Sequence, residues 1–124
     1  MATEAERSKR YRDRHPGVQI EKTKRWRETH PEKIKDIRLR YALRRKYGMT
    51  LGEYDAILAA QAGVCAICGG PPVGPGGRYH VDHDHVSGSV RGLLCGTCNT
   101  GLGQFKDSPG LLLKAVAYLK RAGK

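Results

Sequence analysis

The stretch HVDHDHVSGSVRGLLCGTC, residues 80–98, decides the fold of this chain, because it joins a histidine-rich segment to a Cys-x-x-Cys pair. An earlier pair precedes it, so the chain holds four cysteines: Cys65, Cys68, Cys95 and Cys98. Each pair can chelate one ion, and four thiolates match a closed, tetrahedral structural zinc site. An iron–sulfur cluster or a pair of disulfides is the alternative use of the same cysteines.

The residues between the two cysteine pairs predict a hairpin. Residues 79–83 and 90–94 are expected strands, with a turn at residues 87–89, and the segment after Cys95 is expected to begin a helix. Strict alternation would place His80, Asp82 and Asp84 on one face, and Val81, His83 and His85 on the other. We expect a strand end or turn near Asp84 to relax this alternation, so that Asp82 and His83 approach one point.

Helical patterns flank this segment and define a compact domain over residues 49–124. Thr50 and Glu53 have capping-box form, and the helix that they begin is expected to end at Gly63. Residues 69–77 are rich in glycine and proline and predict a loop, whereas residues 111–119 have helical periodicity. Apolar residues make up only 39% of the chain, so the core is thin and a metal would help to hold it together.

Residues 1–48 predict a basic helical arm, part of it disordered. They carry 16 Lys and Arg against 7 Asp and Glu, whereas the whole 124-residue chain has a net charge of +11. The segment KRYRDRHP recurs as KRWRETHP fifteen residues later, and each unit is expected to be a short helix that ends at His15 or His30, before proline. Such a charge indicates a nucleic-acid partner, with a solvated tail as the alternative. Candidate DNA contacts in the arm are Arg10, Arg25 and Arg40.

The sequence shows neither a membrane-length apolar run nor a signal peptide. We therefore expect a reducing compartment, the cytoplasm, where Cys-x-x-Cys pairs favour metal or redox chemistry over structural disulfides.

The histidine-rich segment suits phosphodiester hydrolysis. A neutral histidine can take a proton from water near neutral pH. A hard divalent ion held by carboxylate and amide oxygens can stabilise the charge on the leaving oxygen. Asn99 directly follows Cys98, so the zinc site would fix its position, and an aspartate of the strand could share one magnesium with it.

Taken in order, CAIC, YHVDHDH, VRGLLC and CGTCN resemble the recombination endonuclease VII family, a phage-type branch of the His-Me finger (HNH) nucleases. The resemblance runs from about Cys65 to Gln104. It implies a structural zinc on the four cysteines and a ββα active site. It also implies products with 5′-phosphate and 3′-hydroxyl ends. The roles that it implies are a metal-binding aspartate at Asp82, a general base at His83, an amide metal ligand at Asn99, a histidine that helps to bind metal or phosphate at His85, and one near the scissile strand at His80.

The sequence departs from the family's junction resolvase at two points. Leu102 stands where that enzyme has a glutamate three residues after the asparagine, so a fuller metal shell does not carry over. The resolvase also has a long C-terminal helical region that builds a dimer, whereas here one predicted helix follows the motif. Junction resolution needs two active sites at a fixed spacing, so the resemblance alone does not separate it from nicking.

The patterns and the resemblance together predict an α+β protein with a small zinc-stapled ββα-metal core, flanking helices and the basic arm. The function they predict is a metal-dependent DNA endonuclease, nicking or cleaving branched DNA, with Mg²⁺ or Mn²⁺ as catalytic ion. Arg91 and Lys106 are further candidate DNA contacts. A homodimer and phage packaging or recombination proteins are candidate partners. The rival interpretations are a non-catalytic zinc-held nucleic-acid-binding protein and a redox or metal-handling protein that uses the cysteine pairs.

Overall fold

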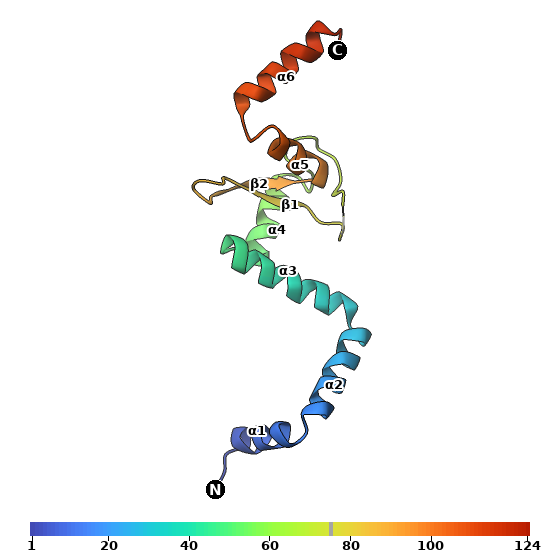
Figure 1. Ribbon diagram of the computed structural model, residues 1–124, viewed down its shortest axis with the longest axis vertical. Coiled ribbons are helices and arrows are strands. Elements are labelled where there is room, and N and C mark those ends of the chain that lie inside the picture. The colour runs from blue at the N-terminus through green and yellow to red at the C-terminus, as the bar shows by residue number, and fades with distance from the viewer. Residues whose placement is uncertain (75) are drawn as a thin grey trace. The chain divides into compact units, whose positions relative to one another are not determined.

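The computed structural model describes residues 1–74 and 76–124, and these residues form two compact units, 1–46 and 47–124 (Figure 1). Among the described residues, no helix combines the length and apolarity needed to cross a membrane.

The first unit consists of consecutive helices joined by single histidines. Helix α1 spans Glu4–Arg14, α2 spans Pro16–Thr29, and α3 spans Pro31–Tyr47, whose last residue belongs to the second unit. The two joints have almost the same backbone dihedral angles, with φ −130° and ψ 57° at His15 and φ −131° and ψ 56° at His30. Each joint precedes a proline, which disfavours the helical conformation in the residue before it. The predicted helix ends at the two histidines are therefore confirmed.

The arm helices α1 and α2 bury no residue, as expected from their charge. Their aromatic side chains contact the joint histidine one turn later. The ring of Tyr11 lies 4.6 Å from that of His15, and the ring of Trp26 lies 5.0 Å from that of His30, centroid to centroid. The fifteen-residue repeat is thus a repeat of structure as well as of sequence.

The second unit has the element order α4 (Leu51–Ala60), β1 (His80–His83), β2 (Val90–Leu94), α5 (Gly96–Gln104) and α6 (Pro109–Arg121). The predicted capping box begins α4, since the hydroxyl of Thr50 accepts from the backbone N–H of Glu53 at 3.1 Å and the Glu53 carboxylate accepts from the Thr50 N–H at 2.7 Å. Loop structure was predicted for residues 69–77 and is observed there, apart from Pro75, which lies outside the described residues.

Strands β1 and β2 form an antiparallel hairpin, and α5 packs against it (Figure 1). The register pairs His80 with Leu94 and Asp82 with Gly92, but His83 pairs with Val90. Arg91 is therefore an extra residue on β2, and this is a β-bulge, which locally kinks and twists a strand. The strand end or turn expected near Asp84 is confirmed, since β1 ends at His83 and a turn follows Asp84. The bulge in β2 lies opposite Asp82 and His83 and was not predicted.

The core of the second unit is small. Its buried side chains are those of Met49, Tyr54, Cys65, Tyr79, Val81, Leu93, Leu94 and Cys95. The hydroxyl of Tyr54 donates to the carbonyl of Tyr79 at 2.9 Å, which joins α4 to the start of β1. The predicted fold class, a small α+β protein with a ββα element and a cysteine cluster, is confirmed.

Candidate metal centre and active site

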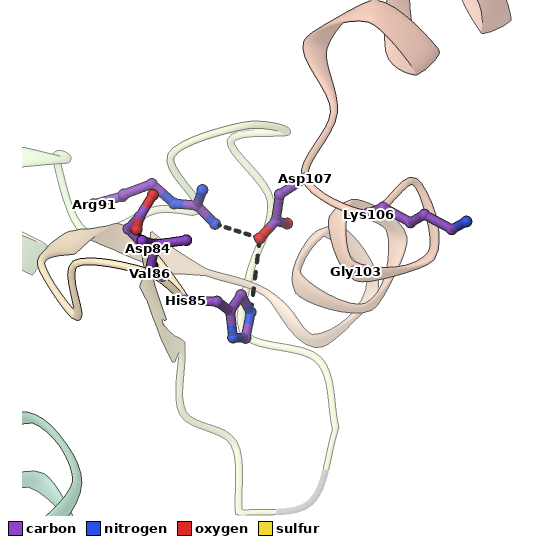
Figure 2. Close-up of a pocket in the computed structure, with 7 residues that line it drawn as sticks. All are labelled: Asp84, His85, Val86, Arg91, Gly103, Lys106 and Asp107. Carbon is purple, nitrogen blue, oxygen red and sulfur yellow. Dashed lines mark hydrogen bonds and ion pairs between the residues drawn. The ribbon is translucent and has the colours of Figure 1, made fainter.

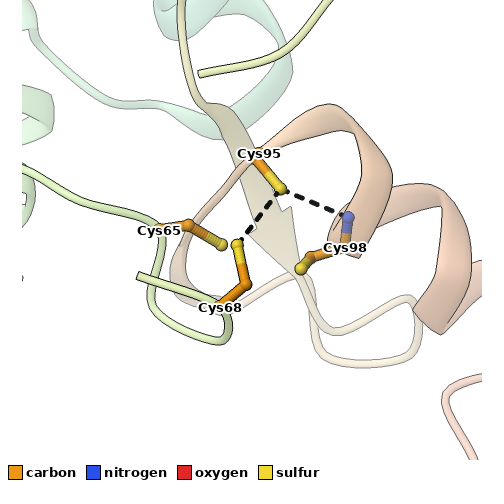
Figure 3. A group of neighbouring side chains, drawn as sticks. All are labelled: Cys65, Cys68, Cys95 and Cys98. Carbon is orange, nitrogen blue, oxygen red and sulfur yellow. Dashed lines mark hydrogen bonds between the residues drawn. The ribbon is translucent and has the colours of Figure 1, made fainter. Parts of the chain in front are cut away.

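The four cysteines meet beside the hairpin (Figure 3). Their sulfur atoms all lie within 4.8 Å of one another, and those of Cys68 and Cys95 are 3.7 Å apart. Backbone N–H groups point at the sulfurs: Gly70 donates to Cys68 at 3.3 Å, and Cys98 donates to Cys95 at 3.4 Å. All four are free thiols, so the disulfide alternative is not what the structure shows.

The charges of this cluster fit a cation at its centre. Burial and the neighbouring sulfurs raise the pKa of the Cys98 thiol. Burial acts in the same direction on Cys65, but backbone N–H groups, first that of Cys95, outweigh it and lower the pKa of that thiol. Thiolates this close repel one another, so all four ionise together only when a cation neutralises them. Zn²⁺ prefers this donor set, so the cluster fits the predicted structural zinc site.

The histidine-rich segment lines a hollow between the hairpin and α5. The residues that line it are Tyr47, His80, Val81, Asp82, His83, His85, Asn99, Gly103 and Asp107. All five side chains predicted for the active site are among them. Strand β1 and the residue two beyond it supply the histidines and Asp82, whereas Asn99 comes from α5, one residue after a zinc-site cysteine. The cysteine cluster at the start of α5 therefore helps to place Asn99 beside β1.

His83 lies between two other rings. Its imidazole centroid is 5.3 Å from the ring of Tyr47 and 4.8 Å from that of His85, with tilted planes in both pairs. The side chain is half-buried, so one part of the ring is held by packing and another reaches solvent. A ring in this setting is restrained in orientation and still accessible to water.

Asp82 forms a two-pronged ion pair with Arg91. Nε and Nη2 of Arg91 donate to Oδ2 and Oδ1 of Asp82, each at 2.8 Å. The same Nη2 donates to Oδ2 of Asp107 at 3.2 Å. These two carboxylates, Asp82 first, raise the pKa of the Arg91 guanidinium. Arg91 was predicted to meet DNA phosphate, and in this structure its charge is paired with Asp82.

A second hollow adjoins the first and is lined by charges of both signs (Figure 2). Arg91 and Lys106 border it together with His85 and two carboxylates, Asp84 and Asp107. The predicted DNA contacts Arg91 and Lys106 thus border one hollow, although the Lys106 side chain points away from Arg91 (Figure 2). Those of the arm, Arg10, Arg25 and Arg40, lie exposed on its helices, and Nε of Arg40 forms an ion pair with Oδ2 of Asp36 at 3.0 Å.

Sequence reasoning missed two residues of the site, Tyr47 and Asp107. Tyr47 lies outside every motif, at the end of a basic helix, and no signal in the sequence singles it out. Asp107 follows α5 in a turn, and an isolated acidic residue in such a segment has no recognisable spacing to the hairpin. Only the fold brings them to the hollow.

Comparison with known proteins gives consistent matches over the second unit. The recombination endonuclease VII family model matches residues 40–121. The Gene 59 protein of Mycobacterium phage D29 is 46% identical over 76 residues, which cover 60% of this chain and 46% of that protein. The Gene 59 protein of Mycobacterium phage L5 is 45% identical over 74 residues, 59% and 44% of the two chains. The chain thus spans less than half the length of these curated relatives.

Among solved structures, the crystal structure of the ββα-Me type II restriction endonuclease Hpy99I matches with a TM-score of 0.43 and 40% identity. That match covers 48% of this chain and 32% of the other.

Proposed function

The chain belongs to the recombination endonuclease VII family, and from this premise we propose that it is a metal-dependent DNA endonuclease of the HNH type that hydrolyses phosphodiester bonds. The substrate is duplex or branched DNA, which it nicks or cleaves at a junction. The observation that carries the proposal is the convergence of His80, Asp82, His83, His85 and Asn99 on one hollow.

His83 serves as the general base. Its imidazole accepts a proton from the attacking water, a task suited to a group that titrates near neutral pH. The rings of Tyr47 and His85 restrain its orientation. The bond between phosphorus and the 3′-oxygen breaks, and that oxygen takes up a proton. The products are therefore a 5′-phosphate and a 3′-hydroxyl.

Asp82 and Asn99 hold the catalytic divalent ion, Mg²⁺ or Mn²⁺. Carboxylate and amide oxygens are the donors that these hard ions prefer, and both residues line the hollow. When bound, the ion stabilises negative charge on the phosphate and on the leaving oxygen. His85 helps to bind the metal or the phosphate, and His80 lies on the side of the scissile strand.

DNA is held by positive charge outside the hollow. Lys106 and Arg91 border the adjoining hollow, and the arm carries Arg10, Arg25 and Arg40. Contacts of this kind position the phosphate backbone without reading its sequence. The protein would act in the cytoplasm, in that of the host if it is encoded by a phage, as a homodimer or beside packaging or recombination proteins.

Plasmid nicking tests the proposal. Supercoiled plasmid is incubated with the zinc-loaded chain and Mg²⁺, then Mn²⁺, beside Asp82→Asn and a matched control, Asp55→Asn on the exposed face of α4. The wild type and Asp55→Asn should convert the plasmid to nicked or linear forms, and Asp82→Asn should bind it without cutting. If no protein cuts with either ion while all bind DNA, the chain is a non-catalytic zinc-held binding module instead.

A further inference from the structure

One guanidinium is shared by two carboxylates at the edge of the proposed active site. Arg91 uses two nitrogens on Asp82, and its Nη2 also reaches Asp107. Figure 2 shows Asp107 joined to Arg91 and also to His85, whose Nε2 lies 3.7 Å from the same Oδ2. The Asp82 side chain is 12% exposed, that of Asp107 21% and that of Arg91 37%. The three charges therefore form one partly buried network.

The turn after α5 places Asp107 in this network at a conformational cost. Lys106 and Asp107 both have positive φ, 55° and 50°, although neither is glycine. The left-handed conformation costs an ordinary residue about 1–2 kcal/mol. Backbone hydrogen bonds hold it, since Asp107 N–H donates to Leu102 at 2.9 Å and Lys106 N–H donates to Gly103 at 3.0 Å. Unfavourable backbone of this kind concentrates at functional sites.

The ion pair conflicts with metal binding at Asp82. Both of its carboxylate oxygens accept hydrogen bonds from Arg91, so a cation that binds there has to displace at least one of them. Arg91, whose side chain is 37% exposed, would then lose part of a two-pronged charge-assisted pair. Asp107 already contacts the same guanidinium, and arginine has five donors, so it can keep the charge paired after Asp82 is released.

We propose that Asp107 is a positioning residue that takes over the guanidinium of Arg91 when Asp82 binds a divalent cation. This inference rests on the proposed function, which makes Asp82 a metal ligand. Arg91 acts as an internal cation that competes for Asp82, and Asp107 weakens that competition.

The transfer of Arg91 from Asp82 to Asp107 is tested by calorimetric titration of Mn²⁺ into the zinc-loaded full chain without DNA. The variants are Asp82→Asn, Asp107→Asn, Arg91→Met and the double variant Asp107→Asn/Arg91→Met. Asparagine tolerates the left-handed conformation, so Asp107→Asn preserves the turn. Asp55→Asn is the control for loss of one negative charge, and Asp107→Glu tests rescue by a retained carboxylate. Unchanged zinc content and circular dichroism establish that each variant is folded.

The wild type should bind Mn²⁺, and Asp82→Asn should abolish that binding. Arg91→Met should tighten binding about tenfold and Asp107→Asn should weaken it about tenfold, within the usual range of coupling between sites. With Arg91→Met already present, Asp107→Asn should change affinity by about threefold or less, the size expected of one charge acting through water. Asp107→Glu should recover part of the loss, and Asp55→Asn should bind as the wild type does.

The titration distinguishes failure of the role given to Asp107 from failure of the proposed metal site. If Asp107→Asn weakens Mn²⁺ binding equally in the wild-type chain and in the Arg91→Met variant, Asp107 acts on the metal directly and the inference is overturned, while the proposed function stands. If Mn²⁺ binding does not depend on Asp82, the metal site of the proposed function fails, and the inference fails with it.

Discussion

The side-chain amide of Gln61 pairs with the backbone of Leu93 as a neighbouring strand would. Its Nε2 donates to the Leu93 carbonyl and its Oε1 accepts from the Leu93 N–H, each at 2.8 Å. Gln61 follows the last residue of α4, so it ties this helix to the outer edge of β2. It also protects a buried backbone segment that the two-stranded sheet leaves without a strand partner on that side.

Gln61→Leu should therefore destabilise the protein. The substitution leaves the buried N–H of Leu93 unpaired, whereas the Leu93 carbonyl still accepts from the N–H of Ala66 at 3.1 Å. An unsatisfied buried group costs about 1–3 kcal/mol. Urea denaturation of the zinc-loaded protein measures the free energy of unfolding. Gln104→Leu, at the exposed end of α5, is the matched control and should change it by less than about 0.5 kcal/mol. Equal stability of the two variants would contradict this role for Gln61.

Gly96→Ala should disturb the loop that closes over the first turn of α5. A Cβ at this position would lie 2.5 Å from the backbone oxygen of Val73, to which the Gly96 N–H donates at 3.2 Å. We expect a loss of about 1–3 kcal/mol in the free energy of unfolding, the range for overpacked sites. Gly101→Ala in the same helix meets nothing within 4 Å and should stabilise by about 0.5–1 kcal/mol, because alanine favours helix. Thermal unfolding in which both variants shift in the same direction would contradict the local geometry.

Removal of zinc should unfold the hairpin and α5. The core of the second unit is small, and two of its buried side chains, Cys65 and Cys95, are proposed zinc ligands. Metal analysis should give one zinc per chain, and a chelator should abolish the circular dichroism of the second unit, which added zinc restores. Cys95→Ser should bind little zinc under the same conditions. A coloured protein that contains iron and sulfide would replace this account with the iron–sulfur alternative.

Neutralising the arm should weaken DNA binding at low salt more than at high salt. Each lysine or arginine that neutralises a phosphate adds about 1 to the slope of log affinity against log salt. The double variant Arg10→Gln/Arg25→Gln should lower the magnitude of that slope by about 2, as measured by fluorescence anisotropy on a labelled duplex. A slope that does not change would mean that neither arginine contacts phosphate, and the arm would then be a solvated tail.

The sequence predicted those parts of the structure that depend on local signals. The capping box of Thr50 and Glu53 predicts the start of α4, and the proline after His15 and after His30 predicts the ends of two arm helices. The cysteine spacing predicted a cluster, because the two sulfurs of each Cys-x-x-Cys pair are already close and the fold has only to bring the two pairs together. Four residues of the motif at 80–85, together with Asn99 beside the second cysteine pair, were likewise expected to converge.

The remainder depends on tertiary contacts that have no sequence period. The bulge at Arg91 arises because β2 carries one residue more than β1 between paired positions. Arg91 lies nine residues from Asp82, and Asp107 lies sixteen from Arg91. An arginine in a basic chain is predicted to meet DNA, and only the folded hairpin reveals that its partner in this structure is a carboxylate.

The central claim is that His83 is the base of a nuclease active site, and chemical rescue tests it most directly. His83→Ala should bind DNA as the wild type does but nick plasmid about 10²–10⁴ times more slowly, the usual contribution of a general base. Added imidazole should restore part of that rate in His83→Ala, without increasing the rate of Asp82→Asn. Nicking by His83→Ala at the wild-type rate would contradict the account.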